Sequence, residues 1–171
     1  MLNFFDQAFQ EEPLKDLQFG LCDNEDGNVA FTDTINNDKW IATVENPDGL
    51  EIIFTAIDKG VIKDDECPGL GRCDGMLTSE HHLYFVELKN GRFGWIQEGF
   101  SQLESTIKLF NDAHPGVGKQ YTHKKAYICN KKHPCFHVID NEQNLKFFKA
   151  YCFRLDIQAN ILFTTSPSPV P

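Results

Sequence analysis

The feature that most constrains the fold is a strand, a helix and a second strand in succession between residues 83 and 129. Residues 83–88 form a short apolar run, which is typical of a buried strand. A second apolar strand is predicted at 124–129. Between them, apolar residues recur at steps of four and three and predict one buried stripe of a helix over 93–113: Ile96, Phe100, Leu103, Ile107 and Phe110. We therefore expect a sheet with this helix packed against it.

The flanking segments predict further strands and helices. Two β-prone runs, 40–44 and 50–57, enclose the turn residues Asn46-Pro47-Asp48-Gly49 and predict a hairpin. Runs 72–78 and 83–88 predict a second hairpin. The remaining expectations are a short amphipathic helix at 2–10, a helical turn at 14–17, a loop at 22–39 with a strand near 29–32, a strand at 135–139, a helix at 141–150 capped by Asp140 or Asn141, and a strand at 151–155. This order predicts an α/β or α+β fold with a central mixed sheet flanked by helices.

Length and composition indicate one domain. With 171 residues the chain can bury a sizeable core, and we expect a single domain over 1–163. The Ser- and Pro-rich segment 164–171 predicts a flexible tail. No apolar run is long enough to cross a membrane, and the first residues lack the pattern of a signal peptide. These features predict a cytoplasmic protein whose six cysteines are mostly reduced.

The charge is divided unevenly along the chain. Residues 1–66 carry 4 Lys/Arg against 16 Asp/Glu, whereas residues 67–171 carry 12 against 9. Five lysines and no acidic residue occur between positions 119 and 132, and they are candidate nucleic-acid contacts: Lys119, Lys124, Lys125, Lys131 and Lys132. An ordinary solvated loop and strand end is an equally good interpretation of this window. The acidic first part could instead receive a basic protein partner.

Two carboxylates and a lysine lie at the ends of the second predicted hairpin. Asp74 begins its first strand, and Glu87 and Lys89 project from one face of the other, because side chains two apart in a strand point the same way. Mg²⁺ prefers oxygen ligands and takes one or two carboxylates with waters. Asp74, Glu87 and the backbone carbonyl of Leu88 could provide such ligands, and Lys89 could contact a water or a phosphate. Taken separately, Glu-x-Lys and Asp-Gly also occur as plain strand and turn residues.

This stretch resembles the PD-(D/E)XK nuclease superfamily, which has the restriction-endonuclease-like fold. The resemblance covers about residues 50–130, with Asp74, Glu87 and Lys89 in the motif positions and Cys73 in place of the proline. It implies a DNA phosphodiesterase dependent on Mg²⁺ or Mn²⁺, with RNA as a further substrate class. Members often carry a glutamine on the following helix, and Gln102 resembles it, with Gln97 as the second choice. Many members also have an N-terminal acidic residue, for which the candidates are Glu11, Glu12 and Glu51.

Three other groups of residues contain side chains that could form a site. Cys129, His133, Cys135 and His137 carry zinc-binding atoms, but their spacing fits no common zinc motif, so buried free cysteines are the better interpretation. Residues 116–119 hint at a phosphate loop, but they follow a helix and lack the full pattern. His81-His82, at the predicted hairpin tip, is typical of exposed residues.

These patterns predict a metal-dependent nuclease acting on DNA, with Asp74 and Glu87 as metal ligands, Lys89 beside the attacking water, and Gln102 in support. The alternative is a nuclease-fold binding module that is inactive alone and works as a subunit of a larger complex. The acidic residues of 1–66 favour that alternative, because a protein that binds DNA by itself usually presents a more positive surface.

Overall fold

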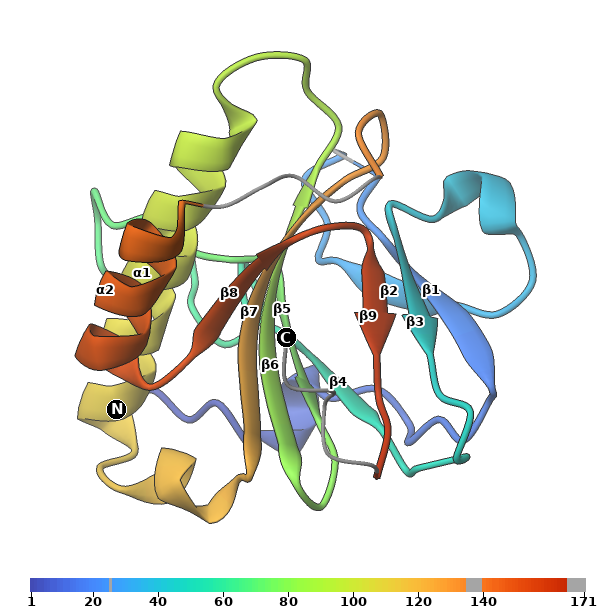
Figure 1. Ribbon diagram of the computed structural model, residues 1–171, viewed down its shortest axis with the longest axis horizontal. Coiled ribbons are helices and arrows are strands. Elements are labelled where there is room, and N and C mark those ends of the chain that lie inside the picture. Colours follow the sequence, from blue (N-terminus) through green and yellow to red (C-terminus); the bar gives the residue numbers. More distant parts are fainter. Residues whose placement is uncertain (25, 135–139, 166–171) are drawn as a thin grey trace.

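The chain folds into two mixed β-sheets and two α-helices, an α+β architecture (Figure 1). The computed structural model describes residues 1–24, 26–134 and 140–165. The five-stranded sheet has the order β4 (Ile53–Ala56), β5 (Gly75–Thr78), β6 (His82–Lys89), β7 (His123–Asn130), β8 (Arg154–Ile157). The four-stranded sheet has the order β2 (Phe31–Asp33), β1 (Gln18–Cys22), β3 (Ala42–Glu45), β9 (Asn160–Leu162). The helices are α1 (Trp95–Ala113) and α2 (Asn141–Tyr151), with single 3-10 turns η1 (Gln7–Phe9), η2 (Asn37–Lys39) and η3 (Val117–Gln120).

The five-stranded sheet is the middle of three layers. In Figure 1 both helices cover one of its faces and the four-stranded sheet lies on the other. Successive residues of β6 serve the two interfaces in turn: Leu83 and Phe85 pack in the core beneath the helices, whereas Tyr84, Val86 and Leu88 pack in the core shared by the two sheets. This alternation is that of a strand buried on both faces, and it directs Glu87 and Lys89 towards α1.

The central prediction is confirmed. β5 and β6 pair antiparallel as a hairpin, and β6 and β7 are parallel strands joined through α1. The helix begins at Trp95, because Gly94 immediately before it adopts φ 69° and turns the chain. The predicted helix at 141–150 corresponds to α2, whose first turn is capped by the Asp140 side chain accepting from the backbone N–H of Glu142.

The predicted hairpin over 40–57 is wrong. The turn is present, and the buried Asn46 side chain holds it by exchanging hydrogen bonds of 2.8 Å with Leu50. The two strands, however, enter different sheets: β3 pairs with β1 and β9, and β4 pairs with β5. A local turn reverses the chain, but the partners of a strand depend on which distant segments cover its faces.

The N-terminal predictions also fail. Residues 2–10 contain only the short turn η1, because Phe4 is fully buried against α1 and Gln10 forms an extended bridge with Thr55. Leu14 bridges Ile52 in place of a helical turn. The predicted strand at 151–155 starts later, at 154, since α2 continues to Tyr151 and Cys152 ends it with φ 60°.

Several other segments differ from expectation or lie outside the described residues. The loop at 22–39 has its strand at 31–33, slightly later than predicted. The strands β1 and β9 were not predicted. The predicted strand at 135–139 lies outside the described residues, as does the predicted tail beyond residue 165. No helix among the described residues has the length and apolar character needed to cross a membrane.

Candidate active site

The pairing of β5 with β6 brings Asp74 to the end of β6. The last pair of the hairpin is Gly75 with Val86, so Asp74 stands just before β5 and opposite the residues that follow Val86. The backbone N–H of Leu88, beyond the last paired residue, donates to Asp74 Oδ2 across 2.6 Å. Two residues that are 14 positions apart in the sequence therefore meet at the open edge of the hairpin.

Glu87 is buried under α1 with one oxygen unsatisfied. Its side chain is 2% exposed. Its Oε1 lies 2.9 Å from Lys89 Nζ, whereas its Oε2 has no hydrogen-bond partner among the described residues. Gly99 of α1 lies against it: a Cβ added there would meet Ile128 Cγ2 at 2.9 Å and Glu87 Cγ at 3.4 Å. The glycine thus lets the helix lie close over the buried carboxylate.

Lys89 connects Glu87 to two side chains of α1. Its Nζ donates to Gln102 Oε1 at 2.6 Å and lies 3.2 Å from Glu98 Oε1. Gln102 also donates from Nε2 to the backbone carbonyl of Arg72 at 3.2 Å. The structure therefore brings Gln102 into the site, while Gln97 is exposed on the helix surface. Glu98 is a site neighbour that sequence reasoning missed.

Burial changes the protonation of both carboxyl groups. Loss of hydration raises the pKa of Asp74 to about 7, although the hydrogen bond from Leu88 opposes the change. Burial, followed by the charge of Asp74, raises the pKa of Glu87 well above its ordinary value. Burial alone would lower the pKa of Lys89, but the attraction of Glu87 and Glu98 outweighs it, and the net change is upward. The site thus combines proton-retaining carboxyls with a lysine that stays cationic at neutral pH.

Two acidic residues that were not expected act on Asp74. Asp23 and Asp58 both raise its pKa through their charges, and Asp58 also pairs with Arg72 at 2.7 Å. Neither could be recognised from the sequence, because Asp23 follows the unpredicted strand β1. Asp58 comes just after β4, where nothing in the pattern marks it.

The three residues proposed for the N-terminal acidic position either bond to other residues or are exposed. Glu11 accepts hydrogen bonds from the backbone N–H and the hydroxyl of Thr32. Glu51 Oε2 lies 3.6 Å from Lys15 Nζ on the surface. Glu12 is exposed.

The five candidate lysines do not form one surface. β7 lies parallel to β6 with His123 opposite His82 and Asn130 opposite Lys89, so position 124 is level with Leu83 and lies about 13 Å along the strand from the level of Glu87. Lys125 is also paired with Asp156 at 3.0 Å. Lys119, Lys124 and Lys125 thus lie towards the far end of the sheet, and only Lys131 and Lys132 are at the end that carries Lys89.

The structure does not turn the Cys/His group or residues 116–119 into a site among the described residues. Cys129 is buried in the core between the sheets, whereas His133 stacks on Trp95 with ring centroids 5.7 Å apart. Cys135 and His137 lie outside the described residues. Residues 117–120 form the 3-10 turn η3, with Gly116 before it at φ 79°.

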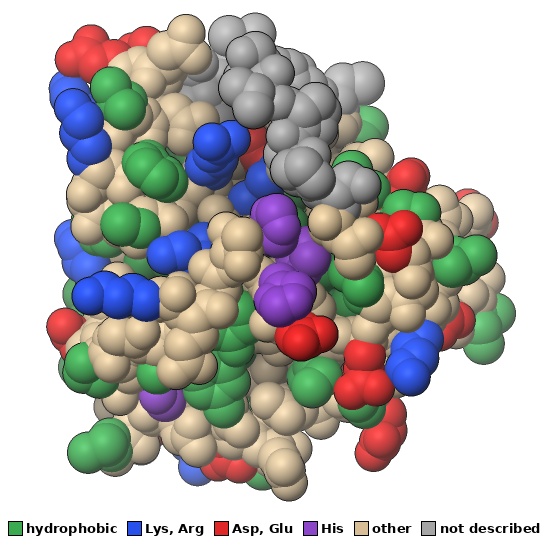
Figure 2. All heavy atoms as spheres, turned by 60° about the horizontal axis from the view of Figure 1, so that its bottom comes forward, with side chains coloured by type: hydrophobic (Ala, Val, Ile, Leu, Met, Phe, Trp, Pro, Cys, Tyr) green, Lys and Arg blue, Asp and Glu red, His purple; other side chains and the backbone are tan. Residues whose placement is uncertain are grey.

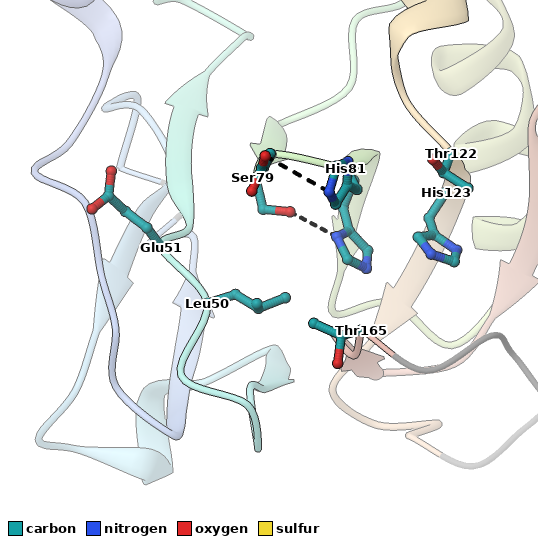
Figure 3. A pocket seen from close by; sticks show the side chains of 9 residues that line it. Leu50, Glu51, Ser79, His81, Thr122, His123 and Thr165 are labelled. Atoms are coloured by element: carbon teal, nitrogen blue, oxygen red, sulfur yellow. Dashed lines mark hydrogen bonds and ion pairs between the residues drawn. The ribbon is translucent and has the colours of Figure 1, made fainter.

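A histidine-lined pocket of about 410 Å³ lies at the other end of β6 (Figure 3). In Figure 2 histidine side chains gather on this face beside acidic ones. His82 was expected to be exposed but is 2% exposed. Its Nε2 lies 3.0 Å from the Thr164 carbonyl and its Nδ1 lies 2.7 Å from Ser79 Oγ, so both ring nitrogens are already bonded within the chain. The ring serves to hold segments together.

Comparison with known proteins assigns nothing to these residues. No family model, no curated protein and no solved structure matches the chain. Within the described residues, no group of three or more His, Cys, Asp and Glu side chains is arranged to hold a metal ion. The pair Asp74 and Glu87 is compatible with that result, because Mg²⁺ commonly uses two carboxylates and completes its shell with water and other oxygens.

Proposed function

We propose that this chain is a metal-dependent nuclease of the restriction-endonuclease-like fold that hydrolyses phosphodiester bonds of DNA. The observation that carries the proposal is Glu87 Oε2, a buried carboxylate oxygen without a hydrogen-bond partner among the described residues. An unsatisfied buried carboxylate is costly unless a cation or a proton compensates it. The neighbouring carboxylate of Asp74 and the nearby lysine favour a divalent cation and a phosphate as what the site receives.

The topology supports the resemblance on which the fold assignment rests. The antiparallel strands β4, β5 and β6 are followed by α1 and by the parallel strand β7, in the order expected around an acidic-x-Lys motif. The motif residues lie at the end of the central strand β6. The resemblance implies a metal site where this hairpin and helix meet.

Asp74, Glu87 and the backbone carbonyl of Leu88 would hold the metal. Because the N–H and C=O of one strand residue point to the same edge, the Leu88 carbonyl faces the same side as the N–H that reaches Asp74. A bound Mg²⁺ or Mn²⁺ would neutralise charge on the phosphate and lower the pKa of a bound water. The metal would also replace the protons that Asp74 and Glu87 retain in its absence.

Lys89 is suited to positioning rather than to accepting a proton. A lysine whose pKa lies above its ordinary value stays protonated at neutral pH and cannot act as a general base. Its Nζ is held by Glu87, Glu98 and Gln102, so it offers a fixed positive charge to a water or a phosphate oxygen. Gln102 keeps the ammonium in place through its own bond to the Arg72 carbonyl.

Cleavage by a lysine variant tests the proposal. Purified protein is incubated with Mg²⁺ or Mn²⁺ and with single-stranded DNA, duplex DNA, branched DNA and RNA. We expect cleavage that Lys89→Ala abolishes and that Lys125→Ala leaves intact, because Lys125 is a half-buried, ion-paired lysine on the adjacent strand away from the site. Absence of cleavage of every substrate, or equal cleavage by Lys89→Ala, contradicts the proposal.

A second candidate function is a binding module that is inactive by itself. The 16 acidic residues against 4 basic ones in residues 1–66 favour it, since they suit a basic protein partner better than DNA. Calorimetric titration with Mn²⁺ separates the two: the nuclease takes up metal and Asp74→Asn does not, whereas a pure binding module takes up none.

A further inference from the structure

The loop between β6 and α1 exposes an aromatic side chain beside the candidate active site. Residues 90–94 join Lys89, the last residue of β6, to Trp95, the first residue of α1. Phe93 in this loop is 93% exposed, and Arg92 before it is also exposed. In Figure 1 the loop stands above α1, at the same end of the sheet as the turn that follows β7.

The base of this loop is anchored although its tip is open. Asn130, which is fully buried, donates from Nδ2 to the carbonyl of Gly91 at 2.8 Å. The backbone N–H of Lys131 donates to the carbonyl of Lys89 at 3.0 Å. These two bonds tie the loop to the end of β7. Phe93 is therefore presented from a held position, four residues from Lys89, rather than from a free chain end.

Positive charges lie at the same edge of the sheet as this aromatic ring. Arg92 follows β6, and Lys131 and Lys132 follow β7. Since the two strands are parallel, all three come to the same edge of the sheet, and all three are exposed. The Lys131 ammonium also donates to the backbone carbonyl of Asp38. A surface depression next to the loop, lined by Gly94, Glu98 and Gln102 among others, continues to the side chains that hold Lys89.

We propose that Phe93 is a stacking platform for an unpaired nucleobase, and that the substrate class is nucleic acid with single-stranded nucleotides at the cleavage point. This inference rests on the proposed nuclease function. An exposed aromatic at an edge of the sheet that also carries cations matches the way in which proteins hold single strands, with a base on the ring and phosphates on the basic side chains. A protein partner would explain the exposed ring but not the three cations at the same edge of the sheet.

The choice of unpaired over paired bases follows from the chemistry of the phenyl ring. Phenylalanine has no hydrogen-bonding group with which to read base edges in a groove, and a base within a duplex has both faces covered. Only a base that is unpaired or at an end offers a free face. The few cations fit a short contact, so the dependence of affinity on salt should be shallow, with a slope of about −2 for three phosphates on a single strand.

Binding without cleavage tests the inference. Fluorescence anisotropy is measured in EDTA with a labelled 12-nucleotide single strand and with the matching duplex, for wild type, Phe93→Ala, Phe93→Trp and Ile35→Ala. Ile35 is the control because it is 91% exposed and lies outside the loop. We expect Phe93→Ala to weaken single-strand binding roughly 5- to 150-fold, with little change for the duplex. Phe93→Trp should retain binding, with its fluorescence quenched by the stacked base, and Ile35→Ala should bind as wild type.

The possible outcomes separate this inference from the nuclease proposal. Single-strand binding by Phe93→Ala equal to wild type, or an equal loss for strand and duplex, overturns the stacking role even if Lys89→Ala abolishes cleavage. A change in oligomeric state on size-exclusion chromatography, with unchanged nucleic-acid binding, assigns Phe93 to a protein contact and also overturns it. Selective loss of single-strand binding by a protein that cleaves nothing supports stacking while the nuclease proposal fails.

Discussion

Leu88 donates its backbone N–H to the carboxylate of Asp74 across 2.6 Å, just beyond the last residue pair of β5 and β6. The bond does two things at once. It satisfies the backbone N–H of Leu88, which has no partner on β5, and it holds the Asp74 carboxylate beside the buried Glu87. The edge of the hairpin is therefore also the place where the charged groups of the candidate site converge.

Metal affinity should rise with pH. The pKa of Asp74 is about 7 and that of Glu87 is well above its ordinary value, so protons compete with a cation below neutrality. We expect Mn²⁺ to bind about fivefold more weakly at pH 6 than at pH 7 if only the proton of Asp74 is displaced, measured by calorimetry. The uptake should vanish in Asp74→Asn at every pH. Affinity that does not change between pH 6 and pH 8 contradicts this account.

The contribution of Asp74 to the stability of the metal-free protein should also depend on pH, but it should fall as the pH rises. Asp74 holds its proton more tightly when folded, so its contribution is fully present below about pH 4 and is lost as the pH rises through about 7. Burial and His123 lower the pKa of His82 to about 4, which acts the other way between pH 4 and pH 6.5. The informative quantity is thus the difference between wild type and Asp74→Asn.

Urea unfolding measures that difference. As the pH rises from 4 to 7, the free energy of unfolding of Asp74→Asn should rise relative to that of wild type. The rise should be on the order of 1.4 kcal/mol for each unit by which the pKa of Asp74 in the folded state exceeds that in the unfolded state. Parallel profiles for the two proteins would mean that Asp74 does not retain a proton in the folded state.

Gln102 should matter for activity more than for folding. Its amide holds Lys89 Nζ at 2.6 Å and reaches back to the Arg72 carbonyl. Gln102→Ala should lower the cleavage rate by about 10-fold or more, the scale of losing one charge-assisted hydrogen bond, with the melting temperature little changed. Gln97→Ala is the matched control on the same helix, and equal rates for the two variants would assign no role to Gln102.

Gly99 should be required for the close approach of α1 to Glu87. An added methyl would meet Ile128 Cγ2 at 2.9 Å, too short to accept without movement, and would touch Glu87 Cγ at 3.4 Å. We expect Gly99→Ala to cost about 1–3 kcal/mol in the free energy of unfolding, despite the better helix propensity of alanine. Gly118→Ala is the control, because its nearest neighbour would be Phe110 Cε1 at 3.8 Å. A fully stable Gly99→Ala protein would show that the helix is free to shift.

The sequence by itself determined the centre of this protein. Apolar residues at helical spacing predicted α1, apolar runs predicted the β5–β6 hairpin and β7, and the two-residue spacing of Glu87 and Lys89 predicted their common face. These features are local: helix and strand periodicity depend only on neighbours in the chain. The same periodicity carried Gln102 to the border of the buried face, where it meets Lys89.

Only the tertiary structure decided how distant segments meet. The turn at Asn46 was recognised, yet its two strands enter different sheets, because β3 finds its partners in β1 and β9. Asp23 and Asp58 act on Asp74 from the ends of β1 and β4, and no local pattern reveals that these two ends lie near it. The basic window between Lys119 and Lys132 is continuous in sequence, but an extended strand of eight residues separates its two ends. Pairing, burial and long-range charge are properties of the packed chain, and the candidate site depends on all three.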